Sequence, residues 1–488
     1  MLAPPSRLET PTERRLALAV LCVSLGVGAA LRVGWALSED GLYWPDEIYQ
    51  SLEPAHRLVF GYGMRAWEFI EGARNWALPG LVAALFKLAT WVGLDGPRGY
   101  LGLTRSLFGL MGVAAAWGSG RLARAYGASA LAAAAGAALF ALGAVPVYFG
   151  PRAMSENASA LPVVLGLALA LAPGASRRAV WVGASLLGLA VLLRLQTGVF
   201  CVGLVAVLAA RREWRSAREA LGVLAVWALL FGLLDWLTWG RWFHSALVYL
   251  DFNLIQGRAA QFGTAPFAYY SRVLGRSMGA LSTLALVLSL LAARRAPGLF
   301  TLAFVFYVLH GVQPHKELRF LVPVMPLVAA LAGVGLDTLL RYLPPSPVRL
   351  ALPLLVVGVG AASALRVGRL TFWDIGQYEH LKPQQSAWDD FGPLNRLLLL
   401  AGQRPDLCGL KVEAAHLAWT GGYSYLHRDV PLYPHTGPGR DAGVYNYVLT
   451  SPGASGAGTV VATEGPYALV RLGAPPCRVD PTWTSRLP

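Results

Sequence analysis

Two adjacent carboxylates, Asp46 and Glu47, stand in the segment WPDEIYQ, just after the first long apolar run of the chain. An Asp at a helix N-cap followed by a Glu in the first turn is ordinary capping chemistry. Alternatively, one carboxylate that is partly desolvated among Tyr43, Trp44 and Tyr49 could act as a general base on an acceptor hydroxyl, with its neighbour orienting it. Burial and an adjacent like charge both raise a carboxylate pKa. Both interpretations are open on these residues alone.

A second cluster of ionisable side chains is the run HKELRF, which contains His315, Lys316, Glu317 and Arg319. Such a run could be a belt of long side chains that reach the membrane interface. A Lys and an Arg with a His at headgroup depth would also bind a lipid-linked phosphate or diphosphate, and Glu317 would then contact the substrate. Because His315 has no second histidine at ligand spacing, we expect neither a metal nor another cofactor.

The segment from Trp67 to Arg74 carries a third group. Six residues separate Glu68 from Arg74, which is not the spacing of a helical ion pair, so a simple surface salt bridge is not implied. The segment could be an amphipathic loop helix with no catalytic role. As part of a site, Arg74 would help to hold the phosphate of a donor, and Trp67 and Glu68 would bind substrate.

Residues 251–270 mix Gly, Asn and aromatic residues between two apolar runs. They could form a long loop whose aromatic side chains only pack. They could also stack against sugar rings, and Asn253 and Tyr269 are then candidate substrate-binding residues. Taken alone, the segment does not distinguish the two roles.

The composition indicates what must position these groups. The chain is 55% hydrophobic and only 14% charged, with a mean hydropathy of +0.49, and apolar runs near spanning length recur along it. We therefore expect an all-α polytopic membrane protein, because lipid-exposed backbone must satisfy its hydrogen bonds within helices. The formal charge of +14 comes from short basic pairs between apolar runs, which is the positive-inside pattern. No basic stripe with interleaved stacking aromatics is present, so nucleic acid is excluded as a partner.

Placing the basic pairs in the cytoplasm predicts about 11 transmembrane helices. Residues 179–210 are too long for one span, so we expect two short helices with a break at 194–196. Residues 76–94 would reverse the charge pattern as a span, so we expect a helix in the interface within the first outside loop. The remaining predicted spans are about 16–37, 100–119, 127–149, 158–173, 219–237, 274–293, 298–312, 319–340 and 349–366.

This arrangement predicts a transmembrane catalytic region over 1–366, with a first extracytoplasmic loop at about 38–99, and a C-terminal extracytoplasmic domain over 367–488. The N-terminus is then cytoplasmic, and the first apolar run is a signal anchor. Cys408 and Cys477 could pair if the tail faces an oxidising compartment. Lysine is scarce while Arg, Ala and Gly abound, which is typical of a GC-rich bacterial genome. We therefore expect the bacterial inner membrane, with the site facing the periplasm.

Four motifs, in order over about 40–325, resemble those of glycosyltransferase family 22. These are the dolichyl-phosphate-mannose-dependent mannosyltransferases of N-glycan and GPI-anchor assembly. HKELRFLVPVMP resembles the HKExRF signature with its following prolines, and RAMSEN resembles the exit of the third helix. WPDEIYQSLEPAHRLVFGYGMRAWEFIEGARNWALP resembles the first luminal loop, and DWLTWGRWFHSALVYLDFNLIQGRAAQFGTAPFAYY resembles a later loop. Residues after about 365 carry no motif that we can match.

The resemblance implies a GT-C type fold and an inverting transfer of mannose, outside the cytoplasmic face, from a polyprenyl-phosphate-linked sugar. The catalytic Asp of the family falls on Asp46, with Glu47 beside it. The basic signature falls on His315, Lys316 and Arg319. The chain departs from the family pattern at positions that bear on the acceptor and the sugar rather than on the catalytic group: Trp44, Ala66, Asn75, Leu195 and Gln196.

From these observations we expect a membrane glycosyltransferase that moves mannose, or a similar hexose, to a glycan or glycolipid acceptor hydroxyl. Asp46 would be the general base. One alternative is a GT-C transferase that modifies lipid A or protein, which would not be expected to carry HKExRF. A polytopic transporter or lipid flippase is an alternative from another class. It should place charged residues midway along its helices and show repeat symmetry, and the chain shows neither pattern.

Overall fold

The computed structural model describes residues 9–41, 45–343, 347–435, 443–451, 458–473 and 476–487. The chain forms two compact units. Unit 1 comprises Met1–Trp35, Ser106–Phe243 and Leu250–Gln385, and unit 2 comprises Ala36–Arg105, His244–Tyr249 and Ser386–Pro488. Unit 2 therefore unites the first loop with the C-terminal tail, which the expected division at residue 366 assigns to different regions.

Helices dominate unit 1, and each predicted apolar span contains one. The principal helices are α1 (Pro11–Ser38), α5 (Pro97–Ala125), α6 (Ala130–Leu142), α7 (Ala144–Phe149), α8 (Ser155–Ala170), α9 (Arg177–Leu193), α10 (Gly198–Ala210), α11 (Trp214–Trp239), α13 (Tyr269–Met278), α14 (Ala280–Ala292), α15 (Pro297–Val312), α16 (Met325–Tyr342), α17 (Val348–Ala364) and α18 (Phe372–Ile375). Short irregular turns join them: η3 (Leu195–Thr197), η4 (Asp251–Ile255), η5 (Arg258–Phe262), η6 (Leu318–Val324) and η7 (Val367–Arg369).

The breaks within the predicted spans are partly as expected. The predicted interruption at 194–196 is confirmed, because η3 separates α9 from α10. Two further breaks were not predicted: Gly143 separates α6 from α7, and Gly279, at a φ of 59°, separates α13 from α14. By length and composition, 4 helices of the described chain could cross a membrane, namely Pro11–Ser38, Trp214–Trp239, Leu318–Tyr342 and Val348–Arg369, and 6 further apolar helices are shorter. The count of about 11 spans stays a prediction.

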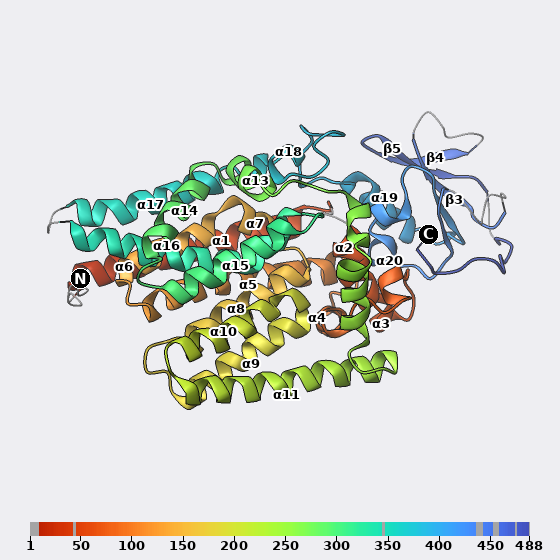
Figure 1. Ribbon diagram of the computed structural model, residues 1–488. Helices are drawn as coiled ribbons and strands as arrows, with labels where there is room; N and C mark the ends of the chain where they lie inside the picture. The colour runs from red at the N-terminus through yellow and green to blue at the C-terminus, as the bar shows by residue number, and fades with distance from the viewer. Residues whose placement is uncertain are drawn as a thin grey trace. The chain divides into compact units, whose positions relative to one another are not determined.

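Figure 1 shows the helices of unit 1 side by side. Small residues allow several of them to approach closely. A Cβ added at Gly166 in α8 would lie 2.7 Å from the carbonyl oxygen of Gly183 in α9. A Cβ added at Gly183 would lie 2.6 Å from the carbonyl oxygen of Gly166. A Cβ at Gly335 in α16 would lie 1.8 Å from the carbonyl oxygen of Leu288 in α14. Backbones at this distance gain dispersion contacts, which is the usual source of stability between helices in lipid.

A buried arginine completes the break between α6 and α7. The side chain of Arg32 in α1 is fully buried and donates to the carbonyl oxygens of Ala141 at 2.6 Å, Phe140 at 3.2 Å and Gly28 at 3.0 Å. Carbonyl groups freed at a helix break cannot turn to water inside a membrane, so an internal donor stabilises the break. Arg32 therefore has a structural role.

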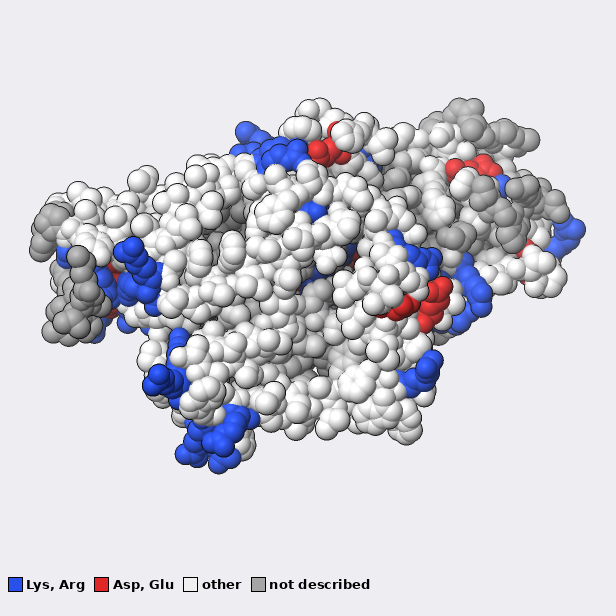
Figure 2. Space-filling model, in the orientation of Figure 1, with Lys and Arg blue, Asp and Glu red and all other residues white. Residues whose placement is uncertain are grey.

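Basic side chains of unit 1 gather at a helix end rather than on its flank. Figure 2 shows blue side chains where α10 and α11 meet, and the flank of α11 is mostly white. The exposed Arg211 and Arg212 lie in this turn, and the exposed Arg215 and Arg218 lie at the start of α11. This distribution is typical of a cytoplasmic loop beside a membrane span.

Unit 2 combines short helices with a mixed five-stranded sheet, so the prediction of an all-α chain is wrong for this unit. Its helices are α2 (Pro45–Glu47), the π-helix η1 (Ile48–Leu52), α3 (Glu53–Phe60), η2 (Trp67–Phe69), α4 (Ala77–Trp91), α12 (His244–Leu250), α19 (Gly392–Gly402), η8 (Leu417–Trp419) and α20 (Gly422–Leu426). The sheet has the order β2-β1-β3-β5-β4, from β1 (Leu410–Val412), β2 (Leu432–Tyr433), β3 (Tyr447–Thr450), β4 (Thr459–Glu464) and β5 (Tyr467–Arg471). β1 pairs in parallel with β2 and β3, whereas β5 runs antiparallel to β3 and β4.

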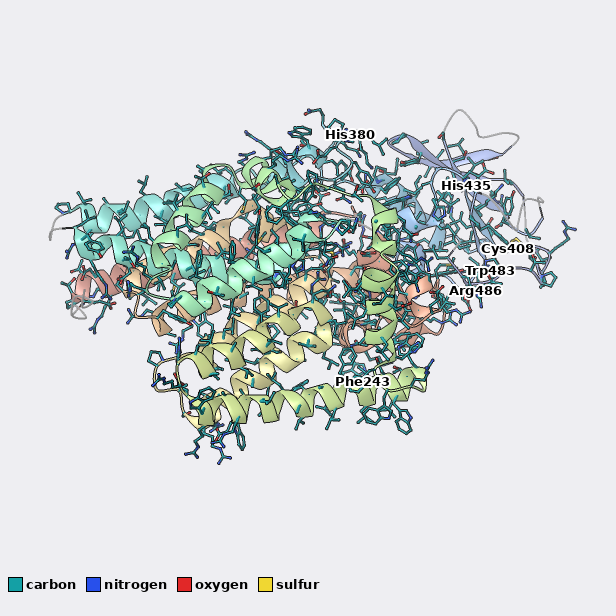
Figure 3. The ribbon with its side chains drawn as sticks, viewed as in Figure 1. Phe243, His380, Cys408, His435, Trp483 and Arg486 are labelled. Carbon is teal, nitrogen blue, oxygen red and sulfur yellow. A yellow bond between two sulfur atoms is a disulfide. The ribbon has the colours of Figure 1, made fainter. Side chains whose placement is uncertain are left out.

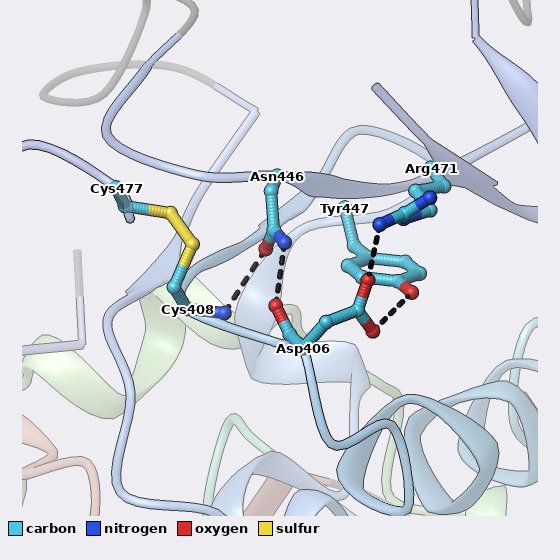
Figure 4. The surroundings of a disulfide bond; sticks show 6 residues. All are labelled: Asp406, Cys408, Asn446, Tyr447, Arg471 and Cys477. Carbon is cyan, nitrogen blue, oxygen red and sulfur yellow. Dashed lines mark hydrogen bonds and ion pairs between the residues drawn. A yellow bond between two sulfur atoms is a disulfide. The ribbon is translucent and has the colours of Figure 1, made fainter. Parts of the chain in front are cut away.

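A disulfide between Cys408 and Cys477 closes the C-terminal part of unit 2, so the pairing that the sequence allowed is present. Figure 4 shows the polar groups around it: Asn446 accepts from the backbone N–H of Cys408 at 3.0 Å, and the Asp406 carboxylate binds Tyr447 and Arg471, each at 2.8 Å. These contacts order the segment before β1.

The last described residues of the chain return to the first loop. The backbone of Arg65 forms an isolated bridge with the segment around Arg486, which Figure 3 labels, through Ser485 at 2.7 Å and Leu487 at 2.9 Å. Trp483 Nε1, labelled in the same view, donates to the Leu432 carbonyl oxygen at 3.2 Å. The tail and the loop therefore share backbone hydrogen bonds.

Candidate active site

The paired carboxylates differ in exposure. Asp46 and Glu47 lie in α2, which continues into the π-helix η1. Asp46 is partly exposed, whereas the side chain of Glu47 is fully buried. Single π-helical turns often occur at functional sites, because they redirect side chains within a helix. Tyr43 and Trp44, which the sequence places beside this pair, lie outside the described residues.

Glu68 joins the electrostatic environment of Asp46. It lies in η2 and is buried, and its carboxylate accepts from Gln50 Nε2 at 3.0 Å. Burial first, and the charge of Asp46 second, raise the pKa of Glu68 to about 7, although the positive charge of Arg74 opposes the shift. In unit 2, two predicted site residues, Asp46 and Arg74, thus act electrostatically on a third, Glu68.

Arg74 and Trp67 belong to the same segment as Glu68 but are more exposed than Glu68. The guanidinium of Arg74 lies over the ring of Tyr249, 5.4 Å from its centroid. Both Arg74 and Trp67 are partly exposed. A planar cation that is fixed by an aromatic face and remains partly accessible is suited to bind an anionic group.

Arg105 is a candidate residue that the sequence reasoning missed. Its Nε lies 3.9 Å from the Glu47 carboxylate, and both side chains are buried. Its Nη1 donates to the carbonyl oxygen of Glu39 at 2.8 Å, and its Nη2 donates to the hydroxyl of Tyr425 at 2.9 Å. The available signal was an arginine inside the predicted span 100–119, where an ionised group is costly without a partner.

In unit 1, the HKELRF run forms a buried charge cluster. Arg319 binds Glu317 through Nε and Nη2, each at 2.9 Å, and His315 Nε2 lies 3.0 Å from the same carboxylate. His315 Nδ1 faces the carbonyl oxygen of Gly263 at 3.1 Å. Since both ring nitrogens face acceptors, the ring satisfies both only as an imidazolium.

The pKa values in this cluster follow the same geometry. Burial disfavours both charged forms, but the hydrogen bond and charge of Glu317 raise the pKa of His315 above its usual value. Burial would also raise the pKa of Glu317, yet Arg319 and His315 outweigh it and lower that pKa to about 2. Glu317 is therefore ionised at neutral pH.

The ammonium group of Lys316 is hydrogen-bonded to the backbone, whereas the sequence predicts that it binds a phosphate. Its ammonium group donates to the carbonyl oxygens of Ala265, at 2.6 Å, and Gln313. The backbone N–H of Ala265 in turn donates to Pro314 at 3.0 Å. These contacts attach the 263–265 loop to the HKELRF run. A role of Lys316 in phosphate binding stays a prediction.

Glu156 and Arg194 extend the cluster of unit 1. A carboxylate oxygen of Glu156 lies 2.8 Å from Arg194 Nη1 and 3.4 Å from Arg319 Nη1, with all three side chains buried. Arg194 and Arg319 also lie over the ring of Phe320, at 5.5 and 5.2 Å. The sequence showed Glu156 and Arg194 in the RAMSEN and RLQ segments but did not connect them with HKELRF.

The two candidate sugar-binding residues of unit 1 lie in different elements. Asn253 is partly exposed in η4. Tyr269 is buried in α13, and its hydroxyl donates to the Gly376 carbonyl oxygen at 3.1 Å. Their predicted substrate contacts stay predictions.

Metal-ligating side chains do not gather in the described residues. Across those residues, no group of three or more His, Cys, Asp or Glu side chains could hold a metal ion. The expectation of a metal-free reaction stays a prediction.

The sequence is similar to those of several described proteins. A model described as the Alg9-like mannosyltransferase family matches residues 27–370. GPI mannosyltransferase 3 of Yarrowia lipolytica is 32% identical over 317 residues, which are 62% of this chain and 60% of that protein. GPI alpha-1,2-mannosyltransferase 3 of Danio rerio is 27% identical over 308 residues, or 60% of this chain and 56% of that protein. The chain thus covers less than two thirds of the length of these relatives.

Two solved structures have similar folds at low sequence identity. ArnT from Cupriavidus metallidurans, bound to undecaprenyl phosphate, matches 96% of this chain and 100% of its own with a TM-score of 0.62 and 15% identity. An Archaeoglobus fulgidus oligosaccharyltransferase, tethered to an acceptor peptide, matches 91% of this chain and 70% of its own with a TM-score of 0.54 and 13% identity. The GT-C type fold is therefore confirmed, and the chain is an integral membrane protein.

Proposed function

The chain belongs to the Alg9-like mannosyltransferase family, and on that basis we propose that it transfers mannose, or a similar hexose, from a polyprenyl-phosphate-linked donor to an acceptor hydroxyl. The observation that carries the assignment of roles is the difference in exposure among the carboxylates of unit 2. Glu47 and Glu68 are buried, whereas Asp46 is partly exposed. A general base must reach the proton that it removes, so Asp46 is the group suited to the task.

In the proposed reaction, the acceptor oxygen attacks C1 of the sugar and transfers its proton to an Asp46 carboxylate oxygen. The bond between C1 and the phosphate oxygen breaks, and the polyprenyl phosphate leaves with the bonding electrons. Attack opposite to the leaving group inverts the configuration at C1. Glu68, whose pKa is about 7, lowers the repulsion on Asp46 when it is protonated.

The leaving phosphate gains negative charge in the transition state, and positive groups stabilise it. We assign this role to Arg74, which shares unit 2 with Asp46. In unit 1, His315, Lys316 and Arg319, with Arg194 bound to the same Glu156 as Arg319, form a second candidate phosphate-binding group. The two glutamates that bind this unit 1 group hold the guanidinium planes in place and limit the net charge. Partial neutralisation allows the cluster to bind a phosphate and also to release it.

We propose that the reaction takes place on the extracytoplasmic face. The disulfide in unit 2 supports this orientation, because such bonds persist in oxidising compartments. The exposed arginines around the α10–α11 turn also support this orientation, because basic residues are enriched on the cytoplasmic side of a membrane protein. A bacterial source, the inner membrane as the location and a glycan or glycolipid as the acceptor belong to the same proposal.

Replacing Asp46 by Asn tests the base. The purified protein in lipid nanodiscs would receive a short-chain polyprenyl phosphate mannose and octyl α-mannoside, and mass spectrometry would quantify the glycosylated product. We expect Asp46→Asn to lower the rate by at least 100-fold, since general base catalysis contributes about that much or more.

Glu71→Gln, at an exposed carboxylate of the same unit, is the matched control and should retain the rate. Product formation by Asp46→Asn at the rate of the control would exclude Asp46 as the base. Movement of the donor across vesicles without any glycosylated product, in the unmodified protein, would instead favour a flippase.

A further inference from the structure

The C-terminal segment 386–487 lies outside the residues matched by the family model, which end at 370. It nevertheless shares unit 2 with the loop that carries Asp46 and Glu47. The two segments are in contact at the loop that carries Asp46 and Glu47. Three of these contacts involve residues near the two carboxylates.

The first contact is through Arg105, which binds both segments. Its Nη2 donates to the hydroxyl of Tyr425 at 2.9 Å, and its Nε faces the buried Glu47 carboxylate at 3.9 Å. Tyr425 is 1% exposed, and its hydroxyl also lies 3.4 Å from the Asp40 carbonyl oxygen. A tyrosine of the tail and the Glu39 carbonyl oxygen therefore fix the guanidinium that faces Glu47.

The second contact lies at Glu53, the first residue of α3. Glu53 accepts from the backbone N–H of Ser424 at 2.6 Å and from its hydroxyl at 2.8 Å, and also from Met64 N at 2.7 Å. Gly422 has a φ of 53°, and a Cβ there would lie 2.8 Å from the Glu53 carboxyl carbon. A glycine is thus required for α20 to approach α3 so closely.

The third contact fixes the π-helix that follows the carboxylates. The hydroxyl of Tyr49 donates to the Leu417 carbonyl oxygen at 2.6 Å, and Tyr49 is 2% exposed. Residues before and after the catalytic pair are therefore bound to the tail, and Glu47 is linked to it through Arg105. Thermal motion of the pair is restricted by side chains that lie outside the residues matched by the family model.

We propose that Tyr425 and Arg105 are positioning residues for the reaction: through the fixed guanidinium they hold Glu47, and through Glu47 they orient Asp46. The inference rests on the proposed function, because orienting Asp46 affects the reaction only if Asp46 is the base. The tail is then a constituent of the catalytic unit. A well-fixed guanidinium favours the ionised form of the nearby carboxylates, so its loosening should alter the pH dependence of the rate.

Tyr425→Phe tests this role because it removes one hydroxyl and keeps the ring. In the nanodisc assay we expect kcat to fall about 10-fold, the KM for the donor to change less than twofold, and the acid limb of the pH–rate profile to move to higher pH. The matched control is Tyr423→Phe in the same helix. Its hydroxyl is equally buried and donates to Val430 at 2.7 Å, which has no role in the proposed site.

The control should share any loss of thermal stability but keep kcat and the acid limb. Equal kcat and equal acid limbs in the two variants would overturn the positioning role. If Tyr425→Phe does not fold, Arg105→Lys enters the same comparison: a shifted acid limb supports the proposal, and an unshifted limb overturns it.

A double variant separates this inference from the proposed function. If Tyr425 acts through Asp46, adding Tyr425→Phe to Asp46→Asn leaves the residual rate unchanged. A further 10-fold loss in that background would show that Tyr425 acts by another route and would overturn the inference. The proposed base itself is decided by Asp46→Asn alone.

Discussion

Glu53 and His56 lie one turn apart in α3, and both side chains are fully buried. Burial raises the pKa of Glu53 to about 7, although hydrogen bonds from Met64 and Ser424 oppose the shift. Burial lowers the pKa of His56 to about 3. In each case the protein favours the neutral form, because a charge in a low-dielectric interior is costly.

The contacts of His56 define its tautomer. Nδ1 lies 2.9 Å from the Tyr62 carbonyl oxygen, which only accepts, so Nδ1 carries the proton. Nε2 then accepts from His427 Nδ1 at 3.0 Å. Protonating His56 would place two N–H groups against each other, and the second histidine comes from the tail.

At the residue scale, this contact predicts a pH dependence of stability. The pKa of His56 falls from 6.5 to about 3 on folding, so the unfolded chain binds more protons and stability is lost as the pH falls through 6.5. The loss between pH 7 and pH 5 is about 2 kcal/mol. Glu53 acts in the opposite direction, because its raised pKa contributes stability at low pH that is lost as the pH rises through about 7.

Thermal unfolding at pH 7 and pH 5 measures the summed effect of Glu53 and His56 on stability. The variant His56→Asn isolates the contribution of His56. We expect a smaller acid-induced loss in His56→Asn than in the unmodified protein. His380→Asn, at the exposed histidine labelled in Figure 3, should behave as the unmodified protein. An identical acid-induced loss in all three proteins would contradict the assignment.

At the element scale, the close packing of α14 and α16 depends on Gly335. A Cβ there would lie 1.8 Å from a backbone oxygen, which cannot rotate away. We expect Gly335→Ala to destabilise the protein by about 1–3 kcal/mol, the usual cost of overpacking, despite the better helix propensity of alanine.

Gly358 in α17 provides the comparison, since no atom lies within 4 Å of an added Cβ. Gly358→Ala should leave the midpoint of thermal unfolding unchanged or raise it slightly, because alanine restricts the unfolded chain. The measurement is the unfolding midpoint of each variant in the same detergent or nanodisc. Similar midpoints for the two substitutions would show that α14 and α16 do not pack as described.

At the scale of the whole molecule, the disulfide constrains a segment of 69 residues that includes α20 and β1 to β5. Closing a loop of that length stabilises by about 4 kcal/mol in the chain-entropy model, and measured values are usually 2–4 kcal/mol. We expect Cys408→Ala with Cys477→Ala to lower the unfolding midpoint and the transfer rate together, because the same segment holds Tyr425.

Cys201→Ala serves as the control, since that cysteine is free and lies in an apolar helix. It should change neither the unfolding midpoint nor the transfer rate. A double cysteine variant with an unchanged midpoint would contradict a stabilising disulfide.

Local patterns determined the membrane character and the positions of the helices. Runs of apolar residues report spanning helices directly, and Arg194 marked the break before η3 because a charged residue interrupts an apolar run. The motif around Asp46 and the HKELRF run indicated the family, which the match over 27–370 confirms. The breaks at Gly143 and Gly279 were not predictable, because a lone glycine is also tolerated inside a packed helix.

The tertiary structure decided what each candidate group contacts. Asp46 and Glu47 are adjacent and chemically similar in the sequence, and only the fold buries one and leaves the other partly exposed. The hydrogen bond between Arg105 and Tyr425 joins residues 320 positions apart, and no local pattern encodes it. The charge of an isolated residue is a property of the sequence, but its partner and its pKa depend on burial and on distant segments that only the folded chain brings together.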